Sequence, residues 1–97
     1  MPKMLTYIAG VSYKEGAFAR LQSLKSGHRL SLVREPQNQY DKNAVAVFDT
    51  DGLHLGYVPA ADAGAITWVV ALDLNAVATL SVGGGSSSLT ITWDNPK

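Results

Sequence analysis

Two short stretches of the sequence place an aromatic ring directly beside charged side chains. Tyr13 is followed by Lys14, and Tyr40 is followed by Asp41 and Lys42. Exposed aromatic rings stack on nucleic-acid bases, and neighbouring cations hold phosphates. This pattern therefore indicates a surface that binds single-stranded nucleic acid. The alternative is that each tyrosine caps the hydrophobic core and exposes only its hydroxyl group.

Catalytic chemistry is harder to build from this sequence. There is no cysteine, so the chain has no disulfide framework, no thiolate metal site and no thiol nucleophile. His28 follows a predicted helix, and His54 alternates with leucines, so we expect it to face solvent. Asp49 and Asp51 lie in the stretch DTDG, where Asp is expected to bond the backbone of a tight turn rather than a metal. We therefore predict a binding module, not an enzyme, with no cofactor and no metal.

The elements that must position these side chains follow from the hydrophobic pattern. Strands are predicted over residues 4–10, 29–34, 44–49, 53–59, 76–82 and 89–93, and helices over 15–27 and 60–72. The stretch GGGSSS between the last two strands is expected to form a floppy hairpin tip. Trp68 is expected in the core, and Trp93 either in the core or on an open face of the sheet. The pattern predicts one mainly β domain over residues 1–97, with two helices and a small, OB-like or SH3-like, partly open barrel of about six strands.

The charge balance limits the kind of nucleic-acid site that the chain can carry. Eight Lys and Arg residues balance eight Asp and Glu residues, and the formal net charge is zero. Because the chain lacks a global basic surface, any such site must be local. Arg34, before the second tyrosine, is a further candidate for a phosphate contact. No targeting segment or bilayer-spanning run is evident, so we expect a soluble, cytoplasmic protein.

The connection between the second and third predicted strands, residues 35–43, is called the polar loop below. Together with its flanking strands it resembles the HIRAN domain. The family pattern is Leu-x-Arg-Glu-Pro-x-Asn-Pro-Tyr-Asp-x-Asn-Ala-Ile-x-Val, then a turn, then Ile-Gly-Tyr-Val-Pro. Residues 32–47 read LVREPQNQYDKNAVAV, with Gln39 in place of the second proline, and residues 55–59 read LGYVP. Residues 8–16, IAGVSYKEG, match the family's first strand and the loop after it. Since the chain begins with Met1, we expect a member of the small, stand-alone bacterial kind.

The resemblance implies an OB-like barrel that binds single-stranded DNA at a free 3′ end, in DNA repair or the processing of stalled forks. By position, the stacking aromatic residues fall on Tyr13 and Tyr40, and the acceptor for the 3′-hydroxyl group falls on Asp41. Phosphate contacts then fall on the nearby cations, Lys14, Lys42 and Arg34. Asn38, Asp41 and Asn43 are expected to bond the loop backbone, and for Asp41 this structural role stays open beside the ligand role.

Two other functions stay open. Ser12 stands where end-binding members have a basic residue, Lys14 stands where they have a further aromatic, and the stretch from Tyr57 to Ala60 has no basic residue. With a net charge of zero, these differences favour a protein or peptide interaction module that kept the fold and lost the DNA site. An enzyme that acts on nucleic-acid ends is the third and weakest hypothesis.

Overall fold

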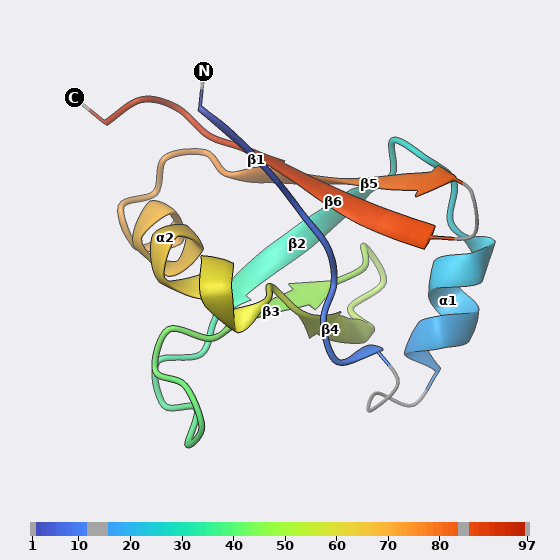
Figure 1. Ribbon diagram of the computed structural model, residues 1–97, viewed down its shortest axis with the longest axis horizontal. Helices are drawn as coiled ribbons and strands as arrows, with labels where there is room; N and C mark the ends of the chain where they lie inside the picture. Colours follow the sequence, from blue (N-terminus) through green and yellow to red (C-terminus); the bar gives the residue numbers. More distant parts are fainter. Residues whose placement is uncertain (1, 12–15, 84–85, 97) are drawn as a thin grey trace.

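The computed structural model describes residues 2–11, 16–83 and 86–96, and these residues form six strands and two helices (Figure 1). In chain order the elements are β1 (Lys3–Thr6), α1 (Ala17–Ser23), β2 (Arg29–Arg34), β3 (Val45–Phe48), β4 (His54–Tyr57), α2 (Ala60–Ala71), β5 (Val77–Gly83) and β6 (Ser86–Thr92). Neither helix within those ranges has the length and apolar character needed to cross a membrane.

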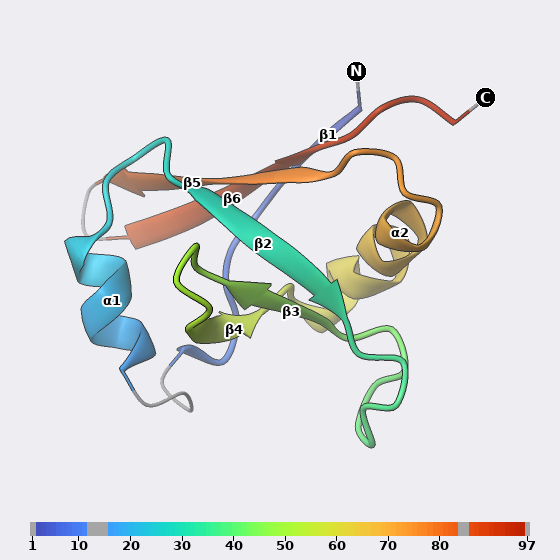
Figure 2. The ribbon, with the colours of Figure 1, turned by 180° about the vertical axis from the view of Figure 1, so that it is seen from behind.

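The strands form one curled antiparallel sheet in the order β1-β6-β5-β2-β3-β4 (Figure 2). The two edge strands of this sheet are β1 and β4, and the chain just after β1 meets β4. The Ala9 amide donates to the Tyr57 carbonyl at 2.7 Å, and the Tyr57 amide donates to the Ala9 carbonyl at 2.8 Å. This bridge joins the chain after β1 to β4, as expected for a small barrel that is closed along only part of its length. The predicted fold class is confirmed.

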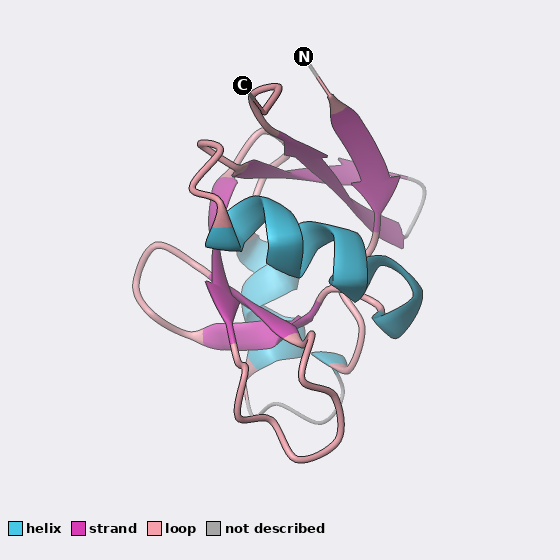
Figure 3. Ribbon diagram, turned by 90° about the vertical axis from the view of Figure 1, so that its left-hand side faces the viewer, coloured by secondary structure: helices cyan, strands magenta, loops and turns pink. Residues whose placement is uncertain are grey.

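The core lies inside the curl. Its largest fully buried side chains come from four strands and one helix: Leu55, Ile66, Leu80, Leu89, Ile91, Val45, Val47 and Val69. Helix α2 contacts β2 and β3, and α1 contacts β4. In Figure 3, α2 crosses in front of the sheet and α1 lies behind it. The alternation predicted for β2 is confirmed, because Leu30 is buried while Arg29 and Ser31 are exposed.

Several predicted boundaries are too long. The first strand ends at Thr6 rather than residue 10. Helix α1 covers only Ala17–Ser23, because Leu24 is already extended at φ −85° and ψ 149°. The GGGSSS stretch contributes to both strands of its hairpin, which stay paired up to Gly83 and Ser86. The hairpin tip itself, residues 84 and 85, lies outside the described residues.

The predictions for two aromatic side chains are wrong. Trp68 is not in the core, since 52% of it is exposed. His54 was expected to face solvent, but it is only partly exposed. Its ring stacks on Phe48 at 4.7 Å between centroids and packs edge-on against Tyr57 at 4.9 Å. Strands β3 and β4 place Phe48 opposite His54 after a shift in their register, and this brings the two rings together. Trp93, which the sequence left open, is partly buried against the core.

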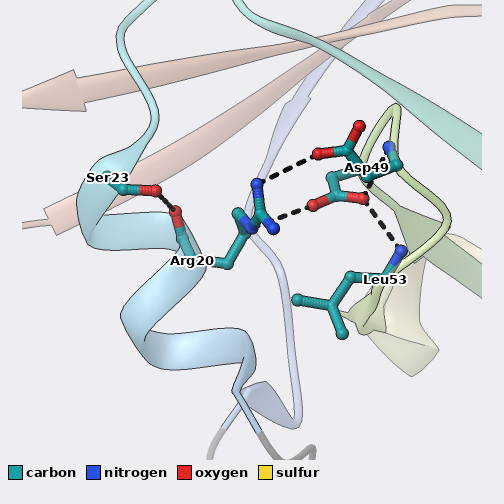
Figure 4. Close-up of polar contacts among 5 residues, drawn as sticks. Arg20, Ser23, Asp49 and Leu53 are labelled. Carbon is teal, nitrogen blue, oxygen red and sulfur yellow. Dashed lines mark hydrogen bonds and ion pairs between the residues drawn. The ribbon is translucent and has the colours of Figure 1, made fainter.

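An ion pair ties α1 to the turn between β3 and β4 (Figure 4). Arg20 Nε lies 3.2 Å from Asp49 Oδ2, and Arg20 Nη1 donates to Asp51 Oδ2 at 3.1 Å. Asp49 Oδ1 accepts the amides of Asp51 and Leu53 at 2.9 and 2.8 Å. The prediction that these carboxylates bond the turn backbone is confirmed for Asp49, whereas Asp51 contacts Arg20 instead. Both carboxylates hold α1, a helix that the sequence did not connect to them.

Replacing Arg20 with alanine is expected to lower the free energy of unfolding by about 1–3 kcal/mol. The substitution leaves Asp49, only 3% exposed, as a buried carboxylate without its cation. The effect stays below that of a fully buried pair because the Arg20 side chain is 38% exposed. Urea denaturation measures it. The matched control is Arg29→Ala, an exposed arginine on β2, and equal losses in the two variants would contradict this role of Arg20.

Candidate nucleic-acid interface

The backbone of the polar loop is held by its own side chains. Asn38 Oδ1 accepts the amides of Tyr40 and Asp41 at 2.9 and 3.1 Å. Asp41 Oδ1 accepts the Asn43 amide at 2.8 Å, and the Asp41 carbonyl accepts the Ala44 amide at 3.1 Å. These are Asx-type turns. The structural role predicted for Asn38 is confirmed. The prediction for Asn43 is wrong, because it contributes its backbone amide and its side chain makes no hydrogen bond to the described residues.

A second set of contacts ties the polar loop to β4. Glu35 Oε1 accepts hydrogen bonds from Asn38 Nδ2 at 3.0 Å and from the Tyr57 hydroxyl at 2.9 Å. The loop also closes on itself, because the Glu35 amide donates to the Ala44 carbonyl at 2.9 Å. Asn38 thus joins both sets of contacts, and the position of Tyr40 depends on Glu35 and Tyr57 through it.

Burial raises the pKa of the Tyr57 phenol above its usual value near 10, and the hydrogen bond to Glu35 and the charge of that carboxylate act in the same direction. The protonated phenol is the form that the fold favours. Its contribution to stability is therefore complete below the unfolded pKa and is lost as the pH rises through the raised folded pKa.

We expect Tyr57 to ionise late, above the usual pKa of a tyrosine, in a titration followed by ultraviolet absorbance. The Tyr57→Phe variant should lack this late component and should be less stable by about 0.5–1.5 kcal/mol at neutral pH, the usual contribution of one hydrogen bond. Tyr7→Phe, which alters an exposed ring on the chain after β1, is the control. A late component that persists in Tyr57→Phe would show that the assignment is wrong.

An open cleft of about 240 Å³ lies between the polar loop and β4. Below it is called the Tyr40 cleft, and it is lined by Ala9, Asn38, Tyr40, Asp41, Ala44, Tyr57, Val58 and Ala60. Its walls are mainly apolar, and Asp41 is among the residues that line it. Tyr40 is 89% exposed, so it does not cap the core. The cleft thus offers a flat aromatic ring, a carboxylate acceptor and apolar surface within one small space.

The predicted site residues do not all lie in the Tyr40 cleft. Tyr40 and Asp41 line it together, whereas Lys42 lines a neighbouring hollow formed by residues 36–42 alone. Arg34 lies at the end of β2, where its Nε donates to Thr67 Oγ1 on α2 at 3.1 Å. Tyr13 and Lys14 lie outside the described residues, so their roles stay predictions.

Tyr57 is a cleft residue that the sequence reasoning did not select as a site residue. The residue stands within the stretch LGYVP that resembled the family, and this was the available signal. Its contact with Glu35, 22 residues away, depends on the pairing of β3 with β4 and could not be read from local patterns.

The comparison with protein families decides the relationship. The model of the HIRAN domain matches residues 3–89. This chain belongs to the HIRAN family. The HIRAN domain is a DNA-binding module.

Named relatives of this HIRAN domain include the helicase-like transcription factors of Mus musculus, 27% identical over 84 residues, and of Oryctolagus cuniculus, 26% identical over 85 residues. These alignments cover 87% and 88% of this chain but only 8% of each relative. The similarity is thus to one small part of much longer proteins.

Solved structures show the same HIRAN fold. The crystal structure of the HIRAN domain of human HLTF has a TM-score of 0.77 at 23% identity, covering 94% of this chain and 74% of that one. A protein from Lactobacillus plantarum has a TM-score of 0.80 at 21% identity, covering 93% of this chain and 95% of that one. At this level of identity the likeness concerns the fold.

Proposed function

We propose that this HIRAN domain is a non-catalytic module that binds single-stranded DNA and prefers a free 3′-hydroxyl end. The observation that carries the proposal is the pairing of Tyr40, an almost fully exposed ring, with the Asp41 carboxylate in one cleft. The terminal base stacks on the ring, and the terminal hydroxyl donates to the carboxylate. Family membership and the residues of the polar loop support this assignment.

The carboxylate is suited to a hydroxyl donor. Asp41 Oδ1 already accepts the Asn43 amide, which fixes the orientation of the group. Among the residues that the structure describes, its other oxygen makes no hydrogen bond. A hydroxyl group can therefore donate to it, whereas a phosphate at the same place would be repelled. The site thus discriminates chemically between a free end and a phosphorylated one.

Stacking carries most of the proposed affinity, since few cations surround the Tyr40 cleft. Base stacking on an aromatic side chain contributes about 1–3 kcal/mol per base and tolerates any sequence. Lys42 is exposed on the polar loop, and the net charge of the chain is zero. We therefore expect little sequence preference and a weaker dependence on salt than that of a basic DNA-binding protein. A role in DNA repair belongs to this proposal through the family resemblance.

Competition between linear and circular single strands tests the proposal. A 5′-labelled oligonucleotide with a free 3′ end is bound to the protein, and unlabelled strands of the same sequence are added while fluorescence anisotropy is followed. The linear strand should displace the probe, and the circular strand, which has no end, should displace it at least tenfold less well. Equal displacement would contradict end recognition, and no binding of the probe would contradict DNA binding altogether.

A protein or peptide interaction module is the second candidate, favoured by the exposed residues of the edge strand β1. Leu5 is 72% exposed, and Tyr7, just beyond β1, is 56% exposed. An extended peptide can add to such an edge through its backbone. A pull-down that recovers one defined partner, is lost in Leu5→Lys and retains no DNA at low salt would favour this function over the first.

A further inference from the structure

The outward side of α2 has an unusual composition for a helix on a protein surface. The exposed residues of this helix are all uncharged, and the next residue, Leu72, is exposed and apolar too. The exposed helix residues are Ala60, Ala61, Gly64, Ala65, Trp68 and Ala71. The charged residue of the helix, Asp62, is half-buried and accepts a hydrogen bond from Thr6 Oγ1 at 2.7 Å. Helices that are apolar on all sides are normally buried, so this outward side is suited to a binding partner.

A cation is anchored to α2 at the residue that precedes Trp68. Arg34 Nε donates to Thr67 Oγ1 at 3.1 Å, and Thr67 immediately precedes Trp68. Arg34 is exposed, so its guanidinium group remains accessible to a ligand. Helix α2 thus carries an exposed indole ring, a stacking surface for a base, and holds at the preceding residue a guanidinium group that can donate to a phosphate.

The Tyr40 cleft and Trp68 lie along the same helix. Ala60, the first residue of α2, lines the cleft. Trp68 follows eight residues later, which is about 12 Å along the helix axis. This length corresponds to about three or four stacked nucleotides. The end of β2, the polar loop and α2 gather on one side of the molecule in Figures 1 and 2.

We propose that Trp68 and Arg34 form a second subsite for single-stranded nucleic acid, reached by nucleotides about three or four positions from the end held in the Tyr40 cleft. This inference rests on the proposed function and extends it from one terminal nucleotide to a path along α2. Small side chains between the two positions, at Ala61, Gly64 and Ala65, let the strand lie close to the helix.

Charge and area favour a nucleic-acid strand over a second copy of the chain. Arg34 offers a phosphate its counter-charge, whereas the exposed residues of α2 are uncharged and would offer this cation no partner in a second copy. A twelve-residue helix is about 18 Å long and about 10 Å wide, which leaves far less surface than the roughly 800 Å² per partner of a stable protein interface. Asp73, just beyond α2, disfavours a phosphate past Trp68 and limits the path.

Oligonucleotide length separates this subsite from the Tyr40 cleft. The test compares two oligothymidylates by titration calorimetry, one of two nucleotides (the dimer) and one of ten (the decamer), both with a free 3′-hydroxyl group. Trp68→Ala should weaken the decamer by about 5- to 150-fold and leave the dimer unchanged, because only the longer strand reaches the helix. Tyr40→Ala should weaken both. Arg34→Ala should weaken the decamer, whereas Arg29→Ala, an exposed arginine on the same strand, should not.

Fluorescence gives a readout that does not depend on affinity. In a Trp93→Phe background, Trp68 is the remaining tryptophan, and the decamer should quench its fluorescence while the dimer does not.

An unchanged decamer affinity in Trp68→Ala, together with a loss in Tyr40→Ala, would overturn the subsite and leave the proposed function standing. Concentration-dependent dimers in sedimentation, abolished by Trp68→Ala without any change in decamer affinity, would overturn it in favour of a second copy. Failure of the wild type to bind either oligonucleotide would overturn both proposals.

Discussion

Replacing Tyr40 with alanine is expected to weaken the binding of a 3′-hydroxyl single strand by about 5- to 150-fold, the equivalent of about 1–3 kcal/mol. The substitution removes the stacking surface from the Tyr40 cleft. Because the ring is 89% exposed, its loss should leave the free energy of unfolding unchanged. Fluorescence anisotropy measures the affinity, and thermal denaturation checks the fold.

Two further variants sharpen this prediction. Tyr40→Phe keeps the ring and should bind nearly as well as the wild type, since stacking does not need the hydroxyl group. Tyr7→Ala removes another exposed tyrosine, 56% exposed and outside the residues that line the cleft. If Tyr40→Ala bound as tightly as Tyr7→Ala, the Tyr40 cleft would not be the binding site.

Gly56→Ala is expected to lower the free energy of unfolding by about 1–3 kcal/mol or more. A methyl group at this position would overlap the Ala9 carbonyl oxygen and come within 2.8 Å of Ile8 Cγ2. The Ala9 carbonyl accepts the Tyr57 amide in the bridge that closes the barrel, so the backbone has little freedom to move away. Urea denaturation measures the loss.

Gly64→Ala is the matched control for this effect. Gly64 is exposed in α2, and a methyl group there meets only Asn43 Nδ2, at 3.8 Å. Since alanine favours a helix interior more than glycine does, this variant should be as stable as the wild type or more stable by about 0.5–1 kcal/mol. Equal destabilisation by the two substitutions would contradict the close crossing at Gly56.

Local patterns were sufficient for much of the fold. Strand β2 covers residues 29–34, as the alternation of Leu30 and Leu32 predicts, because one of its faces is buried and the other is exposed. The DTDG turn forms with Gly52 at φ 88°, a conformation that glycine adopts easily. Helix α2 follows directly after Pro59. In each case the decisive interaction lies within a few residues.

Features that depend on distant pairing could not be predicted in this way. Trp68 was expected in the core and is exposed. Apolar residues lie on both the buried and the exposed sides of α2, so its sequence gives no sign of which side faces outward. The contact of Tyr57 with Glu35 and the ion pair of Arg20 with Asp49 join residues 22 and 29 positions apart. They arise from how the strands pair and where α1 packs.

The candidate site was predicted in part. Tyr40 is exposed and does not cap the core, and Asp41 lines the same cleft, while their role in binding stays a prediction. Arg34 does not line this cleft, because its side chain is bonded to Thr67 on α2. The local signal sufficed for neighbours within the polar loop, whereas the position of Arg34 depends on a hydrogen bond to a residue 33 positions away.

The central claim is that Asp41 reads a free 3′-hydroxyl group, and the affinity ratio between 3′-hydroxyl and 3′-phosphate oligonucleotides tests it most directly. We predict that the wild type prefers the hydroxyl end by at least about tenfold, because the carboxylate repels the phosphate. Asp41→Asn keeps an oxygen for the Asn43 amide and should lose this preference. A ratio near one in the wild type, or an unchanged preference in Asp41→Asn, would contradict the account.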